Sequence, residues 1–489
     1  MSGYQAQYGY TQADNEFGDP LHDDANGERT ETSNVSGNED VTTRLHGLEQ
    51  SLAFGDGWRF DAISGWTDIG NLYTIDFDRS AADSGYSDNT LDERIGSQEL
   101  RLHYTQPRLN AVVGLYYADA ERHTGTTGYD VAAAGGAVLL DGTIVSDSDQ
   151  RTQALFAEAD WDFAEAWRLT AGLRLNDERT RRYDVADLSY TLTAPVPGLP
   201  YGIPIGVPLP DAASDLLAEL LPDYVPPDYA GGERTRFTDV LPKLGIAWLP
   251  SSDASVALTY QEGYRSGGVS ISFFGGAVSP YDPEYTQTLE LAARSRWLDQ
   301  RLTLNANVFY TRWRDQQVTI GESSGFSTTT ENAGRSHYYG LETEALWAAS
   351  GPFEIFATLG LLDSEFDEFV NDGEDYAGNE FPYAPRHTAG LGLRLREWRR
   401  FSGQISVSRI GALYADPDND PRSRAEARTL LHAKLGYRLP AGFSLALYGR
   451  NLTDDPNRQG ALVAGERIAS RYGEPRSFGA VLEWQGSAR

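Results

Sequence analysis

The residues that could carry out chemistry in this chain are histidines, serines and acidic clusters, and their spacing does not favour metal binding. No two histidines form an H-x-x-x-H pair. The acidic stretches 416–420 and 372–375 could bind Ca²⁺ through loop oxygens, but neither has the spacing of an EF-hand loop. We therefore expect solvated acidic loops, with no metal and no other cofactor. The seven histidines are His22, His46, His103, His123, His337, His387 and His432.

A hydrolytic site would require a nucleophile beside a base. His432 falls on an expected strand next to the strand that carries Ser406 and Ser408, and this leaves a hydrolase open as one alternative. The sequence has no G-x-S-x-G, no P-loop and no dinucleotide fingerprint. It also has no cysteine, which removes thiolate nucleophiles. We expect a protein that is not an enzyme.

The pattern that would position these residues is alternation of apolar and polar side chains with a period of two. It runs through 301–312, 352–362 and 387–396, and each run lasts roughly ten residues, the span of a tilted strand that crosses a membrane. Strands of soluble sheets are usually about half as long. In the first run the apolar face carries Leu302, Leu304, Ala306, Val308 and Tyr310.

The same pattern predicts about 18 strands over the whole chain. Their expected starts are Tyr4, Val41, Trp58, Ile95, Leu109, Thr152, Trp167, Thr238, Ser255, Glu284, Arg301, Ser336, Phe353, Arg386, Phe401, Ala427, Phe443 and Pro475.

The connections between these strands alternate in length, as in an up-and-down membrane barrel. Short turns such as Gly55-Asp56-Gly57 and Pro440-Ala441-Gly442 are separated by long polar stretches. We therefore predict an all-β fold, an antiparallel transmembrane β-barrel that forms one domain over residues 1–489. The long stretches are 13–40, 76–93, 124–150, 184–236, 265–283, 320–335, 366–385, 414–426 and 453–474; within 184–236 the pattern at 211–221 is helical.

Tryptophans mark the end of the barrel that carries the short turns. Indole prefers the headgroup level of a membrane, so this clustering predicts an aromatic girdle in contact with lipid. The residues are Trp58, Trp161, Trp167, Trp248, Trp297, Trp347 and Trp398.

Composition agrees with this interpretation. The 489 residues carry a formal net charge of −30, which argues against a nucleic-acid partner because phosphate binding needs a basic face. There is no apolar run of about 18 residues, so the chain is not a helical membrane protein.

Several motifs resemble those of TonB-dependent receptors, the siderophore and cobalamin transporters of Gram-negative outer membranes. Their order and spacing across 240–485 carry the resemblance. At 241–247 the sequence is similar to the family's "PKLG" strand, and at 260–268 to its "GYR.GG" segment. At 283–316 it is similar to the family's "PE…E.G.K…N…FY…D.Q" pattern, with Ala292 where the family usually has Gly. The remaining matches are Asn332-Ala333-Gly334, 340–344, 382–387, 449–454 and 472–479.

The resemblance implies a barrel of about 22 strands with a plugged lumen, so that 18 strands fall four short. It also implies an N-terminal plug, which the TonB–ExbB–ExbD complex acts on. The chain opens Met1-Ser2-Gly3-Tyr4 with no signal-peptide pattern. We therefore expect an N-terminally truncated barrel, without plug or signal peptide, located in the outer membrane.

The resemblance further implies uptake of an extracellular ligand such as an Fe(III)–siderophore. Aromatic and cationic residues near the long connections are the candidate ligand contacts. A passive porin of about 18 strands stays open as an alternative, with 184–236 folded inward as a constriction; clean pairing of the first strand with 475–485 would favour it. The candidate ligand-binding residues are Tyr264, Arg265, Phe273, Phe274, Phe381 and Tyr383.

Overall fold

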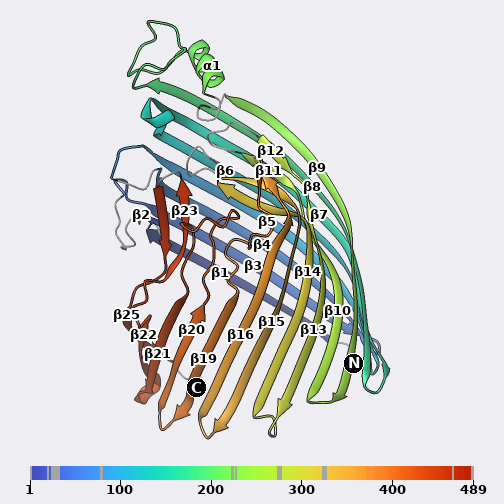
Figure 1. Cartoon of the computed structure of the whole chain (residues 1–489). Coiled ribbons are helices and arrows are strands. Elements are labelled where there is room, and N and C mark those ends of the chain that lie inside the picture. The colour runs from blue at the N-terminus through green and yellow to red at the C-terminus, as the bar shows by residue number, and fades with distance from the viewer. Residues whose placement is uncertain are drawn as a thin grey trace.

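The computed structural model describes residues 3–18, 21–23, 33–77, 81–221, 225, 228–271, 278–321, 328–371, 373–464 and 467–485. Most of these residues are in β-strands (Figure 1). Among the described residues, no helix is long and apolar enough to cross a membrane.

Eighteen long strands form one antiparallel sheet, which confirms the predicted fold class and strand number. The first eight are β1 (Gly3–Gly18), β3 (Asn38–Phe54), β4 (Trp58–Asp76), β5 (Tyr86–Gln106), β6 (Leu109–Ala133), β7 (Val138–Ala164), β8 (Trp167–Leu192) and β9 (Tyr229–Ser251). The other ten are β10 (Ala254–Arg265), β13 (Glu284–Trp297), β14 (Leu302–Gly321), β15 (Thr328–Ser350), β16 (Phe353–Glu368), β19 (His387–Trp398), β20 (Phe401–Ile410), β21 (Arg428–Arg438), β22 (Phe443–Arg450) and β25 (Ser477–Trp484).

Each of these strands pairs with the next one along the chain, so the sheet curves round as an up-and-down barrel wall (Figure 1). The short turns need special backbone conformations. Gly57 has φ +83°, and a Cβ there would lie 2.1 Å from Thr105 O. Three small sheets decorate the opposite rim: β11 (Gly268–Ile271) with β12 (Val278–Tyr281), β17 (Val370–Asn371) with β18 (Glu374–Asp375), and β2 (Leu21–Asp23) with β24 (Arg467–Tyr472) and β23 (Arg458–Ala464).

The two ends of the large sheet are β1 and β25. Within the described residues these strands form no ladder with each other, so the pairing that would favour a closed 18-stranded porin is not observed. The first and last long connections do meet, because β2 pairs with β24 from Leu21↔Arg471 to Asp23↔Ala469.

The outer face of the sheet is an apolar belt. Leu115 and Leu244 are 55% and 56% exposed, which is the pattern of side chains that meet lipid in place of a protein core. The seven tryptophans of the predicted girdle are all exposed and lie at the short-turn rim. The expected aromatic girdle is therefore present, and it places the lower boundary of the belt.

The long connections are shorter than the sequence predicted, because the strands continue into them. Residues 86–93 belong to β5, and most of 124–150 belongs to β6 and β7. Both ends of 184–236 are likewise strand, in β8 and β9. Beyond the membrane both faces of a sheet meet water, so the alternation that identifies a strand disappears while the backbone ladder continues.

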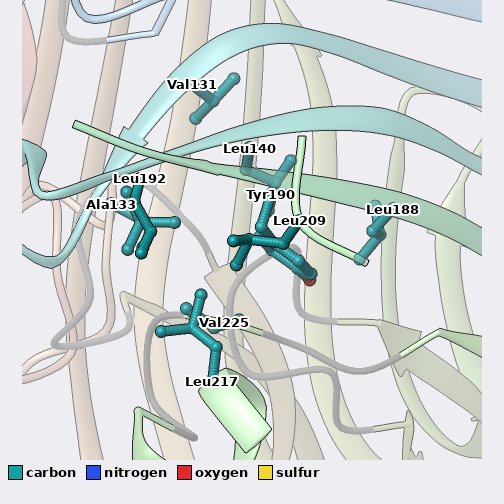
Figure 2. Packing of buried hydrophobic residues seen from close by; sticks show 10 residues of the cluster. Val131, Ala133, Leu140, Leu188, Tyr190, Leu192, Leu209, Leu217 and Val225 are labelled. Atoms are coloured by element: carbon teal, nitrogen blue, oxygen red, sulfur yellow. The ribbon is translucent and has the colours of Figure 1, made fainter. Parts of the chain in front are cut away.

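The middle of 184–236 packs on the tips of β6, β7 and β8. The helix α1 (Asp211–Leu220), which the sequence predicted at 211–221, lies beyond these tips at the top of Figure 1. Leu217 of α1 is fully buried against a small apolar core that includes Leu140, Tyr190 and Leu192 (Figure 2). This segment caps the wall, and the inward constriction suggested for a porin is not what the described residues form.

Candidate functional site

The sheet divides above the membrane between β9 and β10. The two strands pair only from Ala254↔Ser251 to Gln261↔Lys243. Above that level β9 continues with β8 as far as Tyr229, whereas β10 continues with β13 as far as Arg265↔Glu284. The split opens a space on the lumenal side of the wall, near the rim that carries the long connections.

Two tyrosines reach across this split. Tyr264 of β10 donates its hydroxyl to Glu178 Oε2 of β8 at 3.1 Å, and its ring lies 6.3 Å from the ring of Tyr285. Glu178 is 7% exposed, so the hydroxyl satisfies one oxygen of a buried carboxylate. The hydrogen bond from Tyr264 to Glu178 therefore joins the two parts of the wall.

The hairpin β11–β12 covers the split and is held from both sides. Arg182 of β8 donates through Nη1 to Val269 O at 2.7 Å. On the other side, Gln317 of β14 donates through Nε2 to Ser266 O at 2.8 Å and to Asp282 O at 3.1 Å. These bonds satisfy carbonyls that a short, isolated hairpin would leave to water.

Beneath the hairpin lies a cavity of about 430 Å³. Its walls are the lumenal faces of β6 to β9, the end of β10, the hairpin, and the upper parts of β14 and β15. The side chains with the greatest chemical capacity are Arg122, Arg182, Glu233, Arg265, Tyr281 and Gln317. Three guanidinium groups and one carboxylate are therefore exposed to the space inside the cavity.

The three arginines differ in what they already bind. Arg182 Nε lies 2.8 Å from Asp184, and Arg265 Nε lies 2.9 Å from Glu284 Oε1. Arg122 makes no hydrogen bond or ion pair to any residue that the structure describes, and its side chain is exposed. It therefore keeps its donors available for an anion.

The sequence predicted part of this site. Arg265 lines the cavity, and Tyr264 beside it braces the split. Arg122, Arg182 and Gln317 were missed, because they lie in stretches that are polar on both faces and gave no periodic signal. Phe273 and Phe274 lie outside the described residues.

Phe381 and Tyr383 belong to the connection between β16 and β19 and do not line the cavity. Phe381 is 8% exposed in an aromatic core with Phe366, Phe369 and Trp313. Tyr383 is 56% exposed, and its amide donates to Tyr414 O at 2.8 Å. If Phe381 and Tyr383 contact a ligand, they do so at a second site. For Phe381, the aromatic core would also have to open.

Ser406 and His432 are direct cross-strand neighbours on β20 and β21. The imidazole of His432 instead accepts a hydrogen bond at Nδ1 from the backbone N–H of Asn451, at 3.4 Å. Of the residues that the structure describes, no three His, Asp or Glu side chains are grouped to hold a metal ion.

An antiparallel up-and-down sheet with an apolar outer belt and a tryptophan girdle defines the class as an outer-membrane type of β-barrel. Residues 1–452 match the family described as TonB dependent receptor-like, beta-barrel. The chain therefore belongs to this family of receptors, which are outer-membrane proteins of Gram-negative bacteria.

Curated relatives agree with this family. The chain is 28% identical over 244 residues to the pesticin receptor of Yersinia pestis, an alignment that covers 49% of this chain and 35% of that protein. It is 26% identical over 188 residues to the probable TonB-dependent siderophore receptor PiuA of Acinetobacter baumannii, covering 35% and 24%. The alignments thus span about a third or less of these relatives.

Solved structures share the fold. The ferric yersiniabactin uptake receptor FyuA from Yersinia pestis superposes with a TM-score of 0.77 at 18% identity, covering 98% of this chain and 67% of that one. The siderophore receptor PiuA from Acinetobacter baumannii gives 0.68 at 16% identity, covering 98% and 71%.

Proposed function

We propose that this chain forms the barrel wall of a TonB-dependent receptor that takes up a ferric siderophore, or a ligand of similar size and charge, across the outer membrane. The observation that carries the proposal is the arginine-lined cavity under β11–β12, in which Arg122 is free among the described residues. Uptake would be energised by the TonB–ExbB–ExbD complex, as the family implies.

The chemistry of the cavity supports an anionic ligand. Chelates that hold Fe(III) through carboxylate, phenolate or catecholate oxygens carry negative charge on their outer surface. Guanidinium groups match such oxygens with two parallel N–H donors, and the hydroxyl of Tyr281 adds a neutral donor beside them. A volume of about 430 Å³ is in the range of small-molecule pockets, so it would hold a chelate or one lobe of a larger one.

The names of similar proteins point the same way. FyuA is described as a ferric yersiniabactin uptake receptor, FecA as a ferric citrate transporter, and Fiu as a ferric-catecholate import receptor. These three chelates form a defined panel of probes for this chain.

Titration of the full chain in detergent micelles tests the proposal. Ferric yersiniabactin, ferric citrate and a ferric catecholate are added in turn, with the iron-free chelators as blanks, and binding is followed by calorimetry. We expect saturable binding of at least one ferric chelate. Arg122→Gln should weaken this binding by about tenfold, because it removes a charge-assisted contact.

The matched control is Arg312→Gln, which removes an exposed arginine from the outer face of β14, away from the cavity. Its affinity for the chelate should equal that of the wild type. If no member of the panel binds, or if the two variants weaken binding equally, the cavity is not the ligand site.

A further inference from the structure

Two buried carboxylates lie next to each other on the lumenal face of β8 and β9, just below the cavity. Glu178 and Asp239 are 7% and 8% exposed. Asp239 is the direct cross-strand partner of Asn176, so Glu178, two residues further along β8, is its diagonal neighbour on the same face. Thr180 and Thr235, which pair two residues above Glu178, already line the cavity.

Each carboxylate is held by a tyrosine from the other part of the wall. Tyr264 donates its hydroxyl to Glu178 Oε2 at 3.1 Å, and the hydroxyl of Tyr285 donates to the carboxylate of Asp239. The two tyrosines are cross-strand partners on β10 and β13. Main-chain pairing of β9 with β10 stops below this level, so the carboxylates belong to the junction between the two parts of the wall.

One oxygen of each carboxylate has no partner. Glu178 Oε1 and Asp239 Oδ2 are both buried and, among the described residues, accept no hydrogen bond. The two groups are close enough for the charge of Glu178 to act on Asp239. A buried, ionised oxygen without a donor is costly, and a second negative charge beside it adds to the cost.

The cations around the pair are bound elsewhere. The charged groups that face the pair or its tyrosines are Glu158 of β7, Arg174 and Arg182 of β8, Lys243 of β9, Glu262 of β10, and Arg314 and Asp315 of β14. The partners of the four cations are Asn176 for Arg174, Asp184 for Arg182, Glu158 for Lys243 and the ring of Tyr285 for Arg314. In the part of the chain that the structure describes, none of these cations forms an ion pair with Glu178 or Asp239.

We propose that Glu178 and Asp239 share one proton at mildly acidic pH and that this proton closes the split between β9 and β10. A single proton between Oε1 and Oδ2 makes one oxygen a donor and the other its acceptor, so it satisfies both unpartnered atoms at once. When the proton leaves, two charges remain in a buried site, and water must enter the split to solvate them.

The sign of the pH dependence follows from this exchange. The closed split binds a proton that the hydrated, open split releases, so the closed population falls as pH rises. The pair forms the lower edge of the cavity, and opening the split would widen the cavity from below. The inference does not depend on which ligand the cavity binds, because no ligand contact enters it.

Infrared difference spectroscopy of the full chain in detergent micelles tests the shared proton. At each pH from about 8 to about 5, the spectrum of Asp239→Asn is subtracted from that of the wild type, so that other acids such as Asp416 cancel. We expect the band of one protonated carboxyl group per chain to appear in the wild type as pH falls. Glu178→Gln should remove the same band, because a single carboxylate beside an amide donor stays ionised.

The closing of the split is measured separately. The chain has no cysteine, so Thr238→Cys and Arg312→Cys place spin labels at exposed positions of β9 and β14, on opposite sides of the split. Their mean distance should increase from about pH 5 to about pH 8. In Asp239→Asn it should stay short at both pH values, because the neutral amide stands in for the protonated acid.

Asp177→Asn is the matched control. Asp177 precedes Glu178 on β8 but faces outwards, where Arg179 and Arg236 bind it, so this variant should keep both the band and the distance change. The shift in mobility of unheated samples on SDS gels shows that each variant is folded, and Glu178→Gln provides the same test if Asp239→Asn does not fold. Absence of the band in the wild type, its persistence in both amide variants, or a label distance that does not respond to pH would each overturn the proposal.

Discussion

The two sides of the barrel wall differ in how far they rise above the membrane. On one side β5 to β9 have 21 to 27 residues, whereas on the other β19 to β22 and β25 have 8 to 12. A strand of about ten residues suffices to cross the bilayer. The parts of these long strands that lie beyond the membrane therefore extend the barrel wall into water, as the upper part of Figure 1 shows.

What holds each side is also different. The long wall is closed at its tip by the apolar core around Leu217 and Tyr190 (Figure 2). The short wall ends in connections that are tied by hydrogen bonds, and Asn451 at 2% exposure is the centre of one such network. An aqueous sheet needs an apolar core to persist, whereas a loop on a membrane-anchored strand needs only its polar groups satisfied. The lumenal face of the long wall supplies part of the lining of the proposed ligand cavity.

The largest expected effect is at the tip of the long wall. Leu217→Ala empties a fully buried site and should destabilise the tip core by about 4 kcal/mol. Hydrogen exchange at the strand tips, residues 131–140 and 188–192, should accelerate sharply while the belt stays protected. Leu220→Ala, at a site 38% exposed, is the matched control. Uniform protection in Leu217→Ala would show that the tip does not depend on this core.

The base of the same wall is held by charge. Asp61 of β4 is 4% exposed and accepts a hydrogen bond from Ser51, while Arg59 Nε lies 3.0 Å and His103 Nε2 also 3.0 Å from its Oδ2. Asp61→Ala leaves the donors of Ser51 and of the half-exposed Arg59 without their acceptor and should lower stability by about 2 kcal/mol. Chemical unfolding followed by tryptophan fluorescence measures this, with the exposed pair variant Asp119→Ala, expected within about 1 kcal/mol of wild type, as reference.

On the short wall a single amide should matter most. Asn451 Nδ2 donates to Asp455 O at 2.8 Å and to Glu474 O at 3.2 Å, and its Oδ1 accepts from the Asp455 amide at 3.0 Å. Asn451→Ala should cost about 2 kcal/mol, measured as faster proteolysis of the 451–457 connection. Because Asn451 has φ +45°, Asn451→Gly separates the backbone effect. Full recovery in the glycine variant would mean that conformation, and not hydrogen bonding, is responsible.

The comparison also explains what the sequence could predict. All 18 strands were found because the belt imposes apolar residues on one face at every second position, as in 302–310. Strand ends inside the belt, such as Trp58, Trp167 and Phe353, were placed correctly. The sequence predicts loops for the upper halves of β6 to β9. Both faces of these strands meet water there, so apolar residues are no longer required at every second position.

The residues of the candidate site differ in the same way in how far the sequence could predict them. Arg265, a predicted ligand contact, lies in a recognisable strand motif at the end of β10 and lines the cavity. Arg122 and Arg182 lie on strand extensions in water. The registers of β6 with β7 and of β7 with β8 place both of them opposite Ser148 and so bring them to one cavity. Because its neighbours in the sequence are polar, Phe381 is predicted to face the outer opening of the barrel. It packs instead against Phe366 and Trp313, which are distant in sequence. Such convergence depends on sheet register, which composition does not encode.

The smallest expected effect is a pH response of the short wall's 411–427 connection. Burial, with the charge of Asp418, raises the pKa of Asp416 to about 6 from its ordinary 3.8, against a hydrogen bond from Ser423. The folded loop then binds a proton that the unfolded loop releases, so its stability falls as pH rises from 3.8 to about 6. Exchange protection, corrected for intrinsic rates, should be higher at about pH 5 than at about pH 7.

Asp416→Asn should flatten this response, since the amide does not titrate. Asp420 has the opposite sign: Arg422 holds the pKa of its carboxyl below the usual value, so its contribution is lost only as pH falls below 3.8. Asp420→Asn should therefore reduce protection at both pH values by a similar factor, leaving the difference between them intact. A pH response that survives in Asp416→Asn would assign the response to another titratable group.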